Sequence, residues 1–179
     1  MKKLLVLPLL IVMMGFNGDK MTKTKLSDNI SCLLPQNMHP MIEGEVIRRL
    51  PSARKPIAAY TDESQLVDFS VNMAATQWAE KDIEIAQSFY KSSILNLYDD
   101  VKFIKEEIVT INKKQFIVFE FLSLVQGDDL TMKPLRKYSY VQYALYNSQA
   151  LVFGFNCPAQ LRTKWQETAG KIMNSVKIK

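Results

Sequence analysis

Hydrophobic and polar positions alternate with two different periods along the chain. Residues 65–74 alternate with a period of two, with Val67, Phe69 and Val71 on one side, which predicts a strand with one buried face. Residues 80–100 change to helical spacing and predict an amphipathic helix packed along one apolar stripe: Ile83, Ala86, Phe89, Tyr90, Ile94 and Leu97. The chain therefore combines strands and helices.

Two hairpins are predicted in the second half of the chain. Residues 101–111 and 115–125 flank one loop, and residues 136–147 and 149–157 flank another. The segment 115–125 is apolar on both faces, which is typical of a central strand covered on both sides. A last helix begins near Pro158, and its Gly170 is expected to be closely packed, because glycine costs a helix about 1 kcal/mol.

Shorter elements are predicted before residue 65. They are a strand over 29–35, one or two helical turns between Pro40 and Pro51, and a strand over 57–62. Neighbouring strands are joined by hairpins and not by helical crossovers. The fold class is therefore α+β with an antiparallel sheet.

The first residues indicate export. Lys2 and Lys3 precede an apolar run over residues 4–14, which is the pattern of a secretory signal over residues 1–18. An uncleaved anchor that holds the protein loosely at a membrane is the alternative. Residues 19–28 are polar and are interpreted as a tether, and residues 29–179 as a single domain. The predicted location is extracytoplasmic, either periplasmic or secreted.

Composition narrows the classes of partner. The chain is 47% hydrophobic and 23% charged, as in globular proteins. Its net charge of +5 falls to +3 without Lys2 and Lys3, and this excess is too small to indicate nucleic-acid binding.

Two cysteines, Cys32 and Cys157, become informative if the protein is exported. Both lie at alternating positions shared with apolar residues, so both are predicted to face the core. An oxidising compartment permits one disulfide between them, closing a loop of about 125 residues. The alternative is two buried free thiols that pack as small apolar side chains.

The segments "INKKQFIVFEF", "YVQYALYNSQALVFGFNC" and "WQETAGKIMNSVKI" resemble the Mog1p/PsbP-like superfamily, especially its bacterial DcrB-type branch. The resemblance covers about residues 29–178. It implies a twisted antiparallel sheet sandwiched by helices, and non-catalytic accessory or binding roles. Where that family often has an asparagine–glycine turn, this chain has Asn112-Lys113, so a looser hairpin is expected. No functional residue of the family is transferred.

Candidate catalytic and metal-binding residues are few. His39 is the only histidine and is interpreted as a loop residue, with a general base as the alternative. Asp128 and Asp129 are a weak calcium candidate in a loop. No catalytic or nucleotide-binding motif occurs, so no catalytic residue, metal or cofactor is predicted.

Four tyrosines occupy the strand over 136–147. Tyr138, Tyr140 and Tyr146 share one face, and Tyr143 lies on the other. The three could form an aromatic platform for a partner, or they could pack beneath a helix. The predicted function is an exported, non-enzymatic binding or accessory protein with a protein, peptide or envelope partner. The alternatives are a chaperone-like holder of hydrophobic segments and a hydrolase with an unrecognised site.

Overall fold

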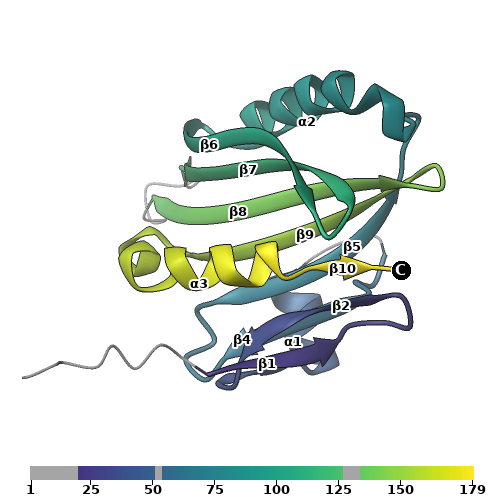
Figure 1. The fold of residues 1–179 in the computed structure, drawn as a ribbon. Coiled ribbons are helices and arrows are strands. Elements are labelled where there is room, and N and C mark those ends of the chain that lie inside the picture. Colours follow the sequence, from purple (N-terminus) through teal and green to yellow (C-terminus); the bar gives the residue numbers. More distant parts are fainter. Residues whose placement is uncertain (1–19, 51–53, 127–133) are drawn as a thin grey trace, which may run out of the picture.

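The structure is a computed structural model and describes residues 20–50, 54–126 and 134–179. The strands are β1 (Met21–Lys25), β2 (Ile30–Pro35), β3 (Met38–Pro40), β4 (Ala58–Asp62), β5 (Asp68–Ala75), β6 (Asp100–Ile111), β7 (Lys114–Val125), β8 (Leu135–Tyr146), β9 (Gln149–Pro158) and β10 (Lys177–Ile178). The helices are α1 (Glu43–Arg49), α2 (Ile83–Leu97) and α3 (Arg162–Asn174), with short 3₁₀ turns at Glu80–Asp82 and Ala159–Leu161. The predicted α+β class is confirmed (Figure 1).

The larger sheet has seven strands in the order β3-β4-β5-β9-β8-β7-β6, and every neighbouring pair is antiparallel. Strands β6 to β9 form a meander, as the two predicted hairpins require. The pairing of β5 with β9 then joins this meander to the first half of the chain, with Phe69 opposite Phe155 and Val71 opposite Phe153. These aromatic and β-branched side chains are fully buried, so the junction lies in the core.

The smaller sheet has the order β1-β2-β10. Ser31 of β2 lies opposite Lys25 of β1 on one side and Lys177 of β10 on the other. The tether predicted over residues 19–28 is therefore wrong for the described residues, because Met21–Lys25 form a strand. Backbone hydrogen bonds to β2 hold this polar segment, and such bonds do not require an apolar sequence.

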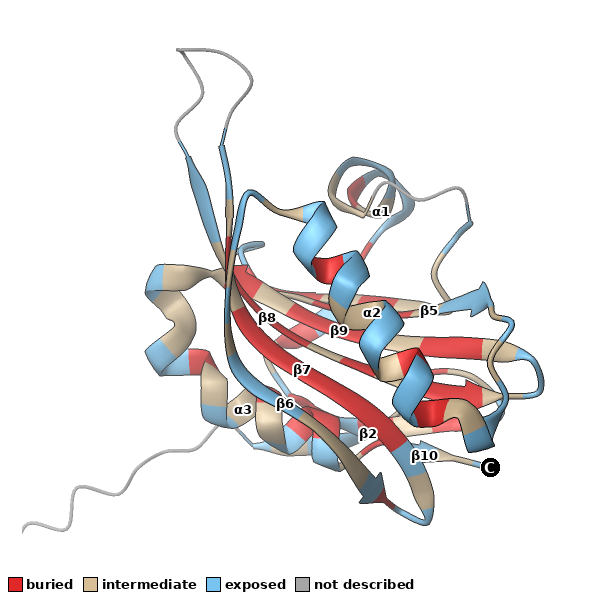
Figure 2. Ribbon diagram, turned by 90° about the horizontal axis from the view of Figure 1, so that it is seen from above, coloured by how far each residue is buried: buried red, intermediate tan, exposed pale blue. Residues whose placement is uncertain are grey.

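Helices α2 and α3 cover opposite faces of the larger sheet (Figures 1 and 2). Helix α2 packs over β6 and β7, and α3 packs over β8, β9 and β2. In α2 the buried residues are Ile83, Ala86 and Ile94. Phe89 and Leu97, which the sequence placed in the buried stripe, are 51% and 70% exposed. Phe89 lies at the margin of the stripe and packs against Trp78 and Tyr90, whereas Leu97 is the last residue of α2, where the helix ends.

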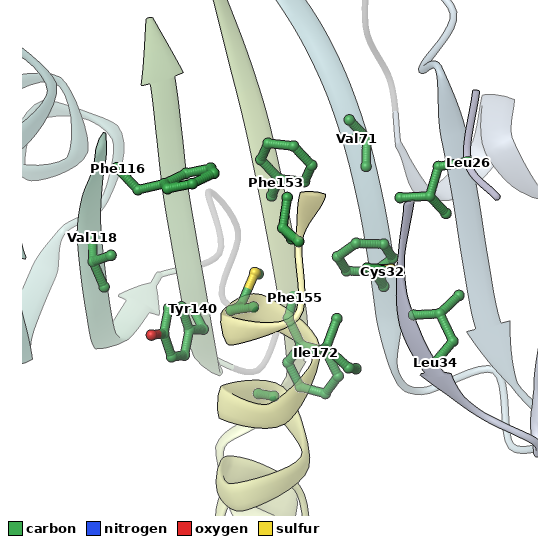
Figure 3. Close-up of a cluster of buried hydrophobic side chains, with 14 of the residues drawn as sticks. Leu26, Cys32, Leu34, Val71, Phe116, Val118, Tyr140, Phe153, Phe155 and Ile172 are labelled. Atoms are coloured by element: carbon green, nitrogen blue, oxygen red, sulfur yellow. The ribbon is translucent and has the colours of Figure 1, made fainter. Parts of the chain in front are cut away.

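The main core lies between the two sheets and α3 (Figure 3). Side chains from β2, β7, β9 and α3 converge there, including Leu34, Phe116, Phe155 and Ile172. The predicted close packing of Gly170 in α3 is wrong, because a Cβ added there would meet no atom within 4 Å. A second cluster lies under α2 and contains Ile117, Phe119 and Phe121 of β7. Strand β7 is thus buried on both faces, as predicted.

The two hairpin turns are tight. Asn112 and Lys113 have φ angles of 49° and 71°, and Asn147 and Ser148 have 49° and 57°. Two successive residues with positive φ are characteristic of the two-residue turns that match the twist of a hairpin. The looser turn expected at Asn112-Lys113 is therefore not observed, and the Asn112 side chain also donates a hydrogen bond of 2.8 Å to the Val176 carbonyl. No helix within the described ranges is long and apolar enough to cross a membrane.

Candidate functional site

The tyrosines of β8 belong mainly to the core. Tyr138 and Tyr140 are 0% and 4% exposed, so the platform interpretation is wrong for these two residues. Tyr138 packs against Phe155 beneath α3, which is the sheet-packing alternative. Tyr146 is half-buried at the end of the strand, where Lys114 Nζ lies 5.2 Å from its ring centroid. Tyr143 faces the other side of the sheet, as predicted, and stacks on Tyr90 of α2.

Cys32 and Cys157 are buried free thiols in the structure. They lie on β2 and β9 and both belong to the main core. Burial raises the pKa of each thiol to about 12. A thiol with such a pKa is protonated near neutral pH and is a poor nucleophile. Neither cysteine is therefore suited to covalent catalysis.

His39 is exposed but lies in β3, opposite Thr61, so its interpretation as a loop residue is wrong: backbone pairing with β4 makes this short segment a strand. It lines none of the three cavities described below. Asp128 and Asp129 lie outside the described residues. Among the residues that the structure does describe, no group of three or more His, Cys, Asp or Glu is placed to hold a metal ion.

The most distinctive surface is the solvent side of the smaller sheet. Residues directly opposite one another in an antiparallel sheet point to the same face. The pairing therefore places Lys25, Ser31 and Lys177 in one row across the three strands, and Lys23 and Leu33 in the next row. We call this surface the lysine face and define it by Lys23, Lys25 and Lys177. All three lysines are exposed, whereas Ile30, Cys32 and Leu34 on the opposite side of β2 are buried.

A cavity of about 490 Å³ opens on the lysine face. Its floor is partly apolar, and its lining residues come from β1, β2, the β6–β7 turn, the end of α3 and β10: Met21, Lys23, Ser31, Cys32, Leu33, Asn112, Lys171, Asn174, Ser175 and Lys177. A second cavity of about 300 Å³ shares Lys23 and Ser31 with it and adds Lys25 and Lys179. Cavities of this size accommodate a short peptide segment or a small ligand.

Hydrogen bonds fix the frame of this cavity. The hydroxyl of Ser175, at the end of α3, accepts a bond of 2.7 Å from the Leu33 N–H and donates one of 2.6 Å to the Ile172 carbonyl. The Asn112 side chain holds the Val176 carbonyl from the β6–β7 turn. Segments that are far apart in sequence are thereby locked together around the lysines.

The charge of the lysine face is largely uncompensated. The segments 20–35 and 177–179 contain five lysines and a single side-chain carboxylate, Asp28. Asp28 pairs with Lys25 at 2.7 Å, and both side chains are well exposed. Within the described residues Lys23 and Lys177 form no ion pair. Two unpaired cations around a partly apolar floor favour an anionic partner that also offers some apolar contact.

A second polar site lies at the other end of the core. Arg49 of α1 forms an ion pair with Asp68 of β5, and both side chains are largely buried. Arg49 also donates a hydrogen bond of 2.9 Å to Thr61. Burial raises the pKa of Asp68 to about 6, although Arg49 and Lys137 act against this shift. A cavity of about 220 Å³ lies beside the pair. Because Arg49 and Asp68 already neutralise each other, neither charge is left free to bind a ligand there.

A buried carboxylate, Glu120 of β7, was not identified from the sequence. It is 4% exposed beneath α3 and accepts hydrogen bonds from Tyr138 and Gln166. Tyr138 comes from the neighbouring strand β8 and Gln166 from α3, so the buried carboxylate links the sheet to this helix. The only signal was a lone acid within an apolar run, which alone does not distinguish an exposed from a buried carboxylate.

Comparison with solved structures identifies the fold. The chain is similar to cyanobacterial PsbP of Synechocystis, with a TM-score of 0.57 and 10% identity over 92% of this chain and 96% of that one. It is also similar to the Saccharomyces cerevisiae Ran-binding protein Mog1p, with a TM-score of 0.58 and 10% identity over 90% and 96%. A third similar structure is Mycobacterium tuberculosis LpqN, described as involved in cell envelope biogenesis, with a TM-score of 0.56 and 9% identity over 89% and 90%.

These similarities give the chain a Mog1p/PsbP-like fold, as the sequence resemblance predicted. No protein-family model and no curated protein matches the sequence. The DcrB-type branch stays a prediction. At sequence identities near 10% these similarities establish only the fold. The function of the site is therefore inferred from its own residues.

Proposed function

We propose that this chain is an exported, non-enzymatic binding protein whose lysine face holds an acidic part of a protein or peptide partner. The observation that carries the proposal is the unpaired state of Lys23 and Lys177 beside an apolar floor. Clustered like charges repel one another and reduce stability slightly. An anionic partner would relieve this repulsion, which gives the cluster a role in binding that it lacks in folding.

The wider fold supports a binding role. Of the similar proteins, Mog1p is described as Ran-binding and LpqN as involved in cell envelope biogenesis. Export rests on the predicted signal over residues 1–18, which lies outside the described residues. Mass spectrometry of the exported protein tests it: a chain that begins near residue 19 supports cleavage, and an intact Met1 favours the anchor.

The two alternative functions have less support. A chaperone-like holder needs an open apolar groove on a sheet face, but α2 and α3 lie over opposite faces of the central strands. A hydrolase needs an activated group in a cavity. His39 lines neither main cavity, and the thiols of Cys32 and Cys157 have a raised pKa.

Affinity capture with charge-reversed variants tests the proposal. The full chain and a K23E/K177E variant are used to capture partners from an extract of the native source. We expect a partner that is retained by the wild type and lost with the variant. The matched control is K81E/K102E, which reverses two exposed lysines near α2 and on β6, away from the lysine face. A partner that is retained equally by all three proteins would contradict a role of the lysine face.

A further inference from the structure

Strand β1 is an edge strand of the smaller sheet, with β2 on one side only. Figure 1 shows it at the lower margin of the fold, with β2 between it and β10. An edge strand presents unpaired backbone groups along its free side. The backbone of β1 therefore lies directly beside the lysines of the lysine face.

The register identifies which backbone groups are free. Gln36 N–H donates to the Lys20 carbonyl at 3.0 Å, and Leu26 N–H donates to the Ile30 carbonyl at 2.9 Å. Residues that bond to the partner strand alternate with residues that do not. Thr22 and Thr24 are thus bonded to β2, whereas Met21, Lys23 and Lys25 direct their N–H and C=O groups to the open side.

The same residues combine two features. Lys23 and Lys25 each offer a free N–H and C=O at the edge and an ammonium group on the solvent face. A strand added beside β1 would place every second side chain next to one of these ammonium groups. Acidic residues at alternate positions would then pair with Lys23, which has no ion pair within the described residues, and with Lys25, whose exposed ion pair with Asp28 they would share or replace, while the backbones form a ladder.

The lysines also exclude a competing occupant. Pairing of β1 with β1 of a second copy would bring lysines together on one face, and like charges across strands are destabilising. An acidic strand meets no such repulsion. The edge therefore discriminates by charge between self-association and an acidic partner.

We infer that the partner of the lysine face binds as an extended acidic segment that adds a strand to the free edge of β1, with acidic side chains at alternate positions opposite Lys23 and Lys25. This inference rests on the proposed function and specifies its geometry. The backbone ladder provides affinity for an extended chain. The two lysines provide the selection for acidic side chains.

Amide hydrogen exchange of the full chain, followed by NMR, tests the inference. The probe is a synthetic peptide that alternates threonine and glutamate over about seven residues, a typical strand length. Without peptide, the amides of Thr22 and Thr24 should exchange slowly and those of Lys23 and Lys25 rapidly. At saturating peptide, exchange at Lys23 and Lys25 should slow at least about tenfold, because each tenfold in exchange corresponds to about 1.4 kcal/mol of protection.

Two control peptides separate the backbone from the charge. A peptide of the same sequence with N-methyl groups on the residues that face β1 keeps the charge but cannot form the ladder. A peptide of the same composition with its glutamates in one block keeps the charge but not the alternation. Both should bind at least about tenfold more weakly than the alternating peptide. Equal binding of all three peptides would overturn strand addition.

Lysine variants distinguish the inference from the proposed function. Strand addition makes K23E/K25E more damaging than K177E, because Lys177 lies two strands from the edge, about 10 Å away. Peptide binding that shifts Ser31 and Lys177 signals but leaves exchange at Lys23 and Lys25 unchanged would overturn strand addition and retain the proposed function. An alternating peptide that does not bind would also overturn it, and the capture experiment would then decide on the lysine face independently.

Discussion

The phenol of Tyr138 donates a hydrogen bond of 3.1 Å to the buried carboxylate of Glu120, across the neighbouring strands β8 and β7. Gln166 of α3 donates to the same oxygen. The network joins the larger sheet to the helix that covers it. Burial and the adjacent Glu120 carboxylate raise the pKa of Tyr138 well above its usual range, so the phenol remains a donor at any physiological pH.

Removing this donor should destabilise the fold. Y138F leaves a buried carboxylate with one partner fewer, and the free energy of unfolding should fall by about 1–3 kcal/mol. The matched control is Y140F, because Tyr140 is equally buried and its hydroxyl donates no hydrogen bond within the described residues. Y140F should change stability by less than about 1 kcal/mol. Equal losses in chemical denaturation would show that the Glu120 bond contributes little.

The Arg49–Asp68 pair predicts a pH dependence of stability. The pKa of Asp68 rises from 3.8 to about 6 on folding, so the folded state binds more protons between these values. Stability from this group is therefore greatest below pH 3.8 and is lost as the pH rises through 6. The shift of about two pKa units corresponds to at most about 3 kcal/mol. D68N should remove this part of the profile, and denaturation at several pH values measures it.

The sign of that effect is the decisive observation. Other carboxylates contribute their own pH dependence, so the comparison is made between the wild type and D68N at each pH. A wild type that gains stability relative to D68N as the pH rises from 4 to 7 would contradict the raised pKa. It would indicate that Arg49 outweighs burial at Asp68.

Thiol titration tests the state of the two cysteines. The native protein should react very slowly with a thiol reagent, because both thiols are buried and have a raised pKa. After denaturation without reductant, two thiols per chain should react. If none reacts in the protein recovered from an oxidising compartment, Cys32 and Cys157 are bridged there.

Gly170 offers a stabilising substitution. It lies within α3, and an added Cβ would meet no atom within 4 Å. G170A should therefore increase the free energy of unfolding by about 0.5–1 kcal/mol, because alanine is favoured over glycine in a helix interior. Thermal unfolding provides the measurement. A lower midpoint would mean that the helix must approach a neighbour more closely than the structure shows.

Long periodic segments could be predicted from the sequence. The strand around Phe69, the double-faced strand β7 and helix α3 were identified because burial imposes a regular spacing on many residues. Strand β1 was missed because its threonines and lysines are polar on both faces. Strand β1 is ordered by its hydrogen bonds to β2, and its amino-acid composition does not indicate this pairing.

The lysine face could not be predicted for a different reason. It depends on strand pairing that places Lys25, Ser31 and Lys177 side by side. The local sequence pattern does not indicate which strands, distant in sequence, will pair. The tyrosines differ, because the sequence left two interpretations open, a platform for a partner and packing beneath a helix. Their shared face was correctly predicted, but the sequence could not show that α3 covers Tyr138 and Tyr140.

The position of β10 has a consequence for the order of folding. The strands of the smaller sheet come from the beginning and the end of the described chain. Lys177 of β10 can therefore pair with Ser31 of β2 only after the residues between them have been synthesised. Contacts between such distant segments form late, since their closure costs entropy before they give stability. The complete cation cluster therefore exists only on fully folded molecules. A partner that requires Lys177 as well as Lys23 would not bind nascent or partly unfolded chains. Its binding would therefore select molecules that have completed folding.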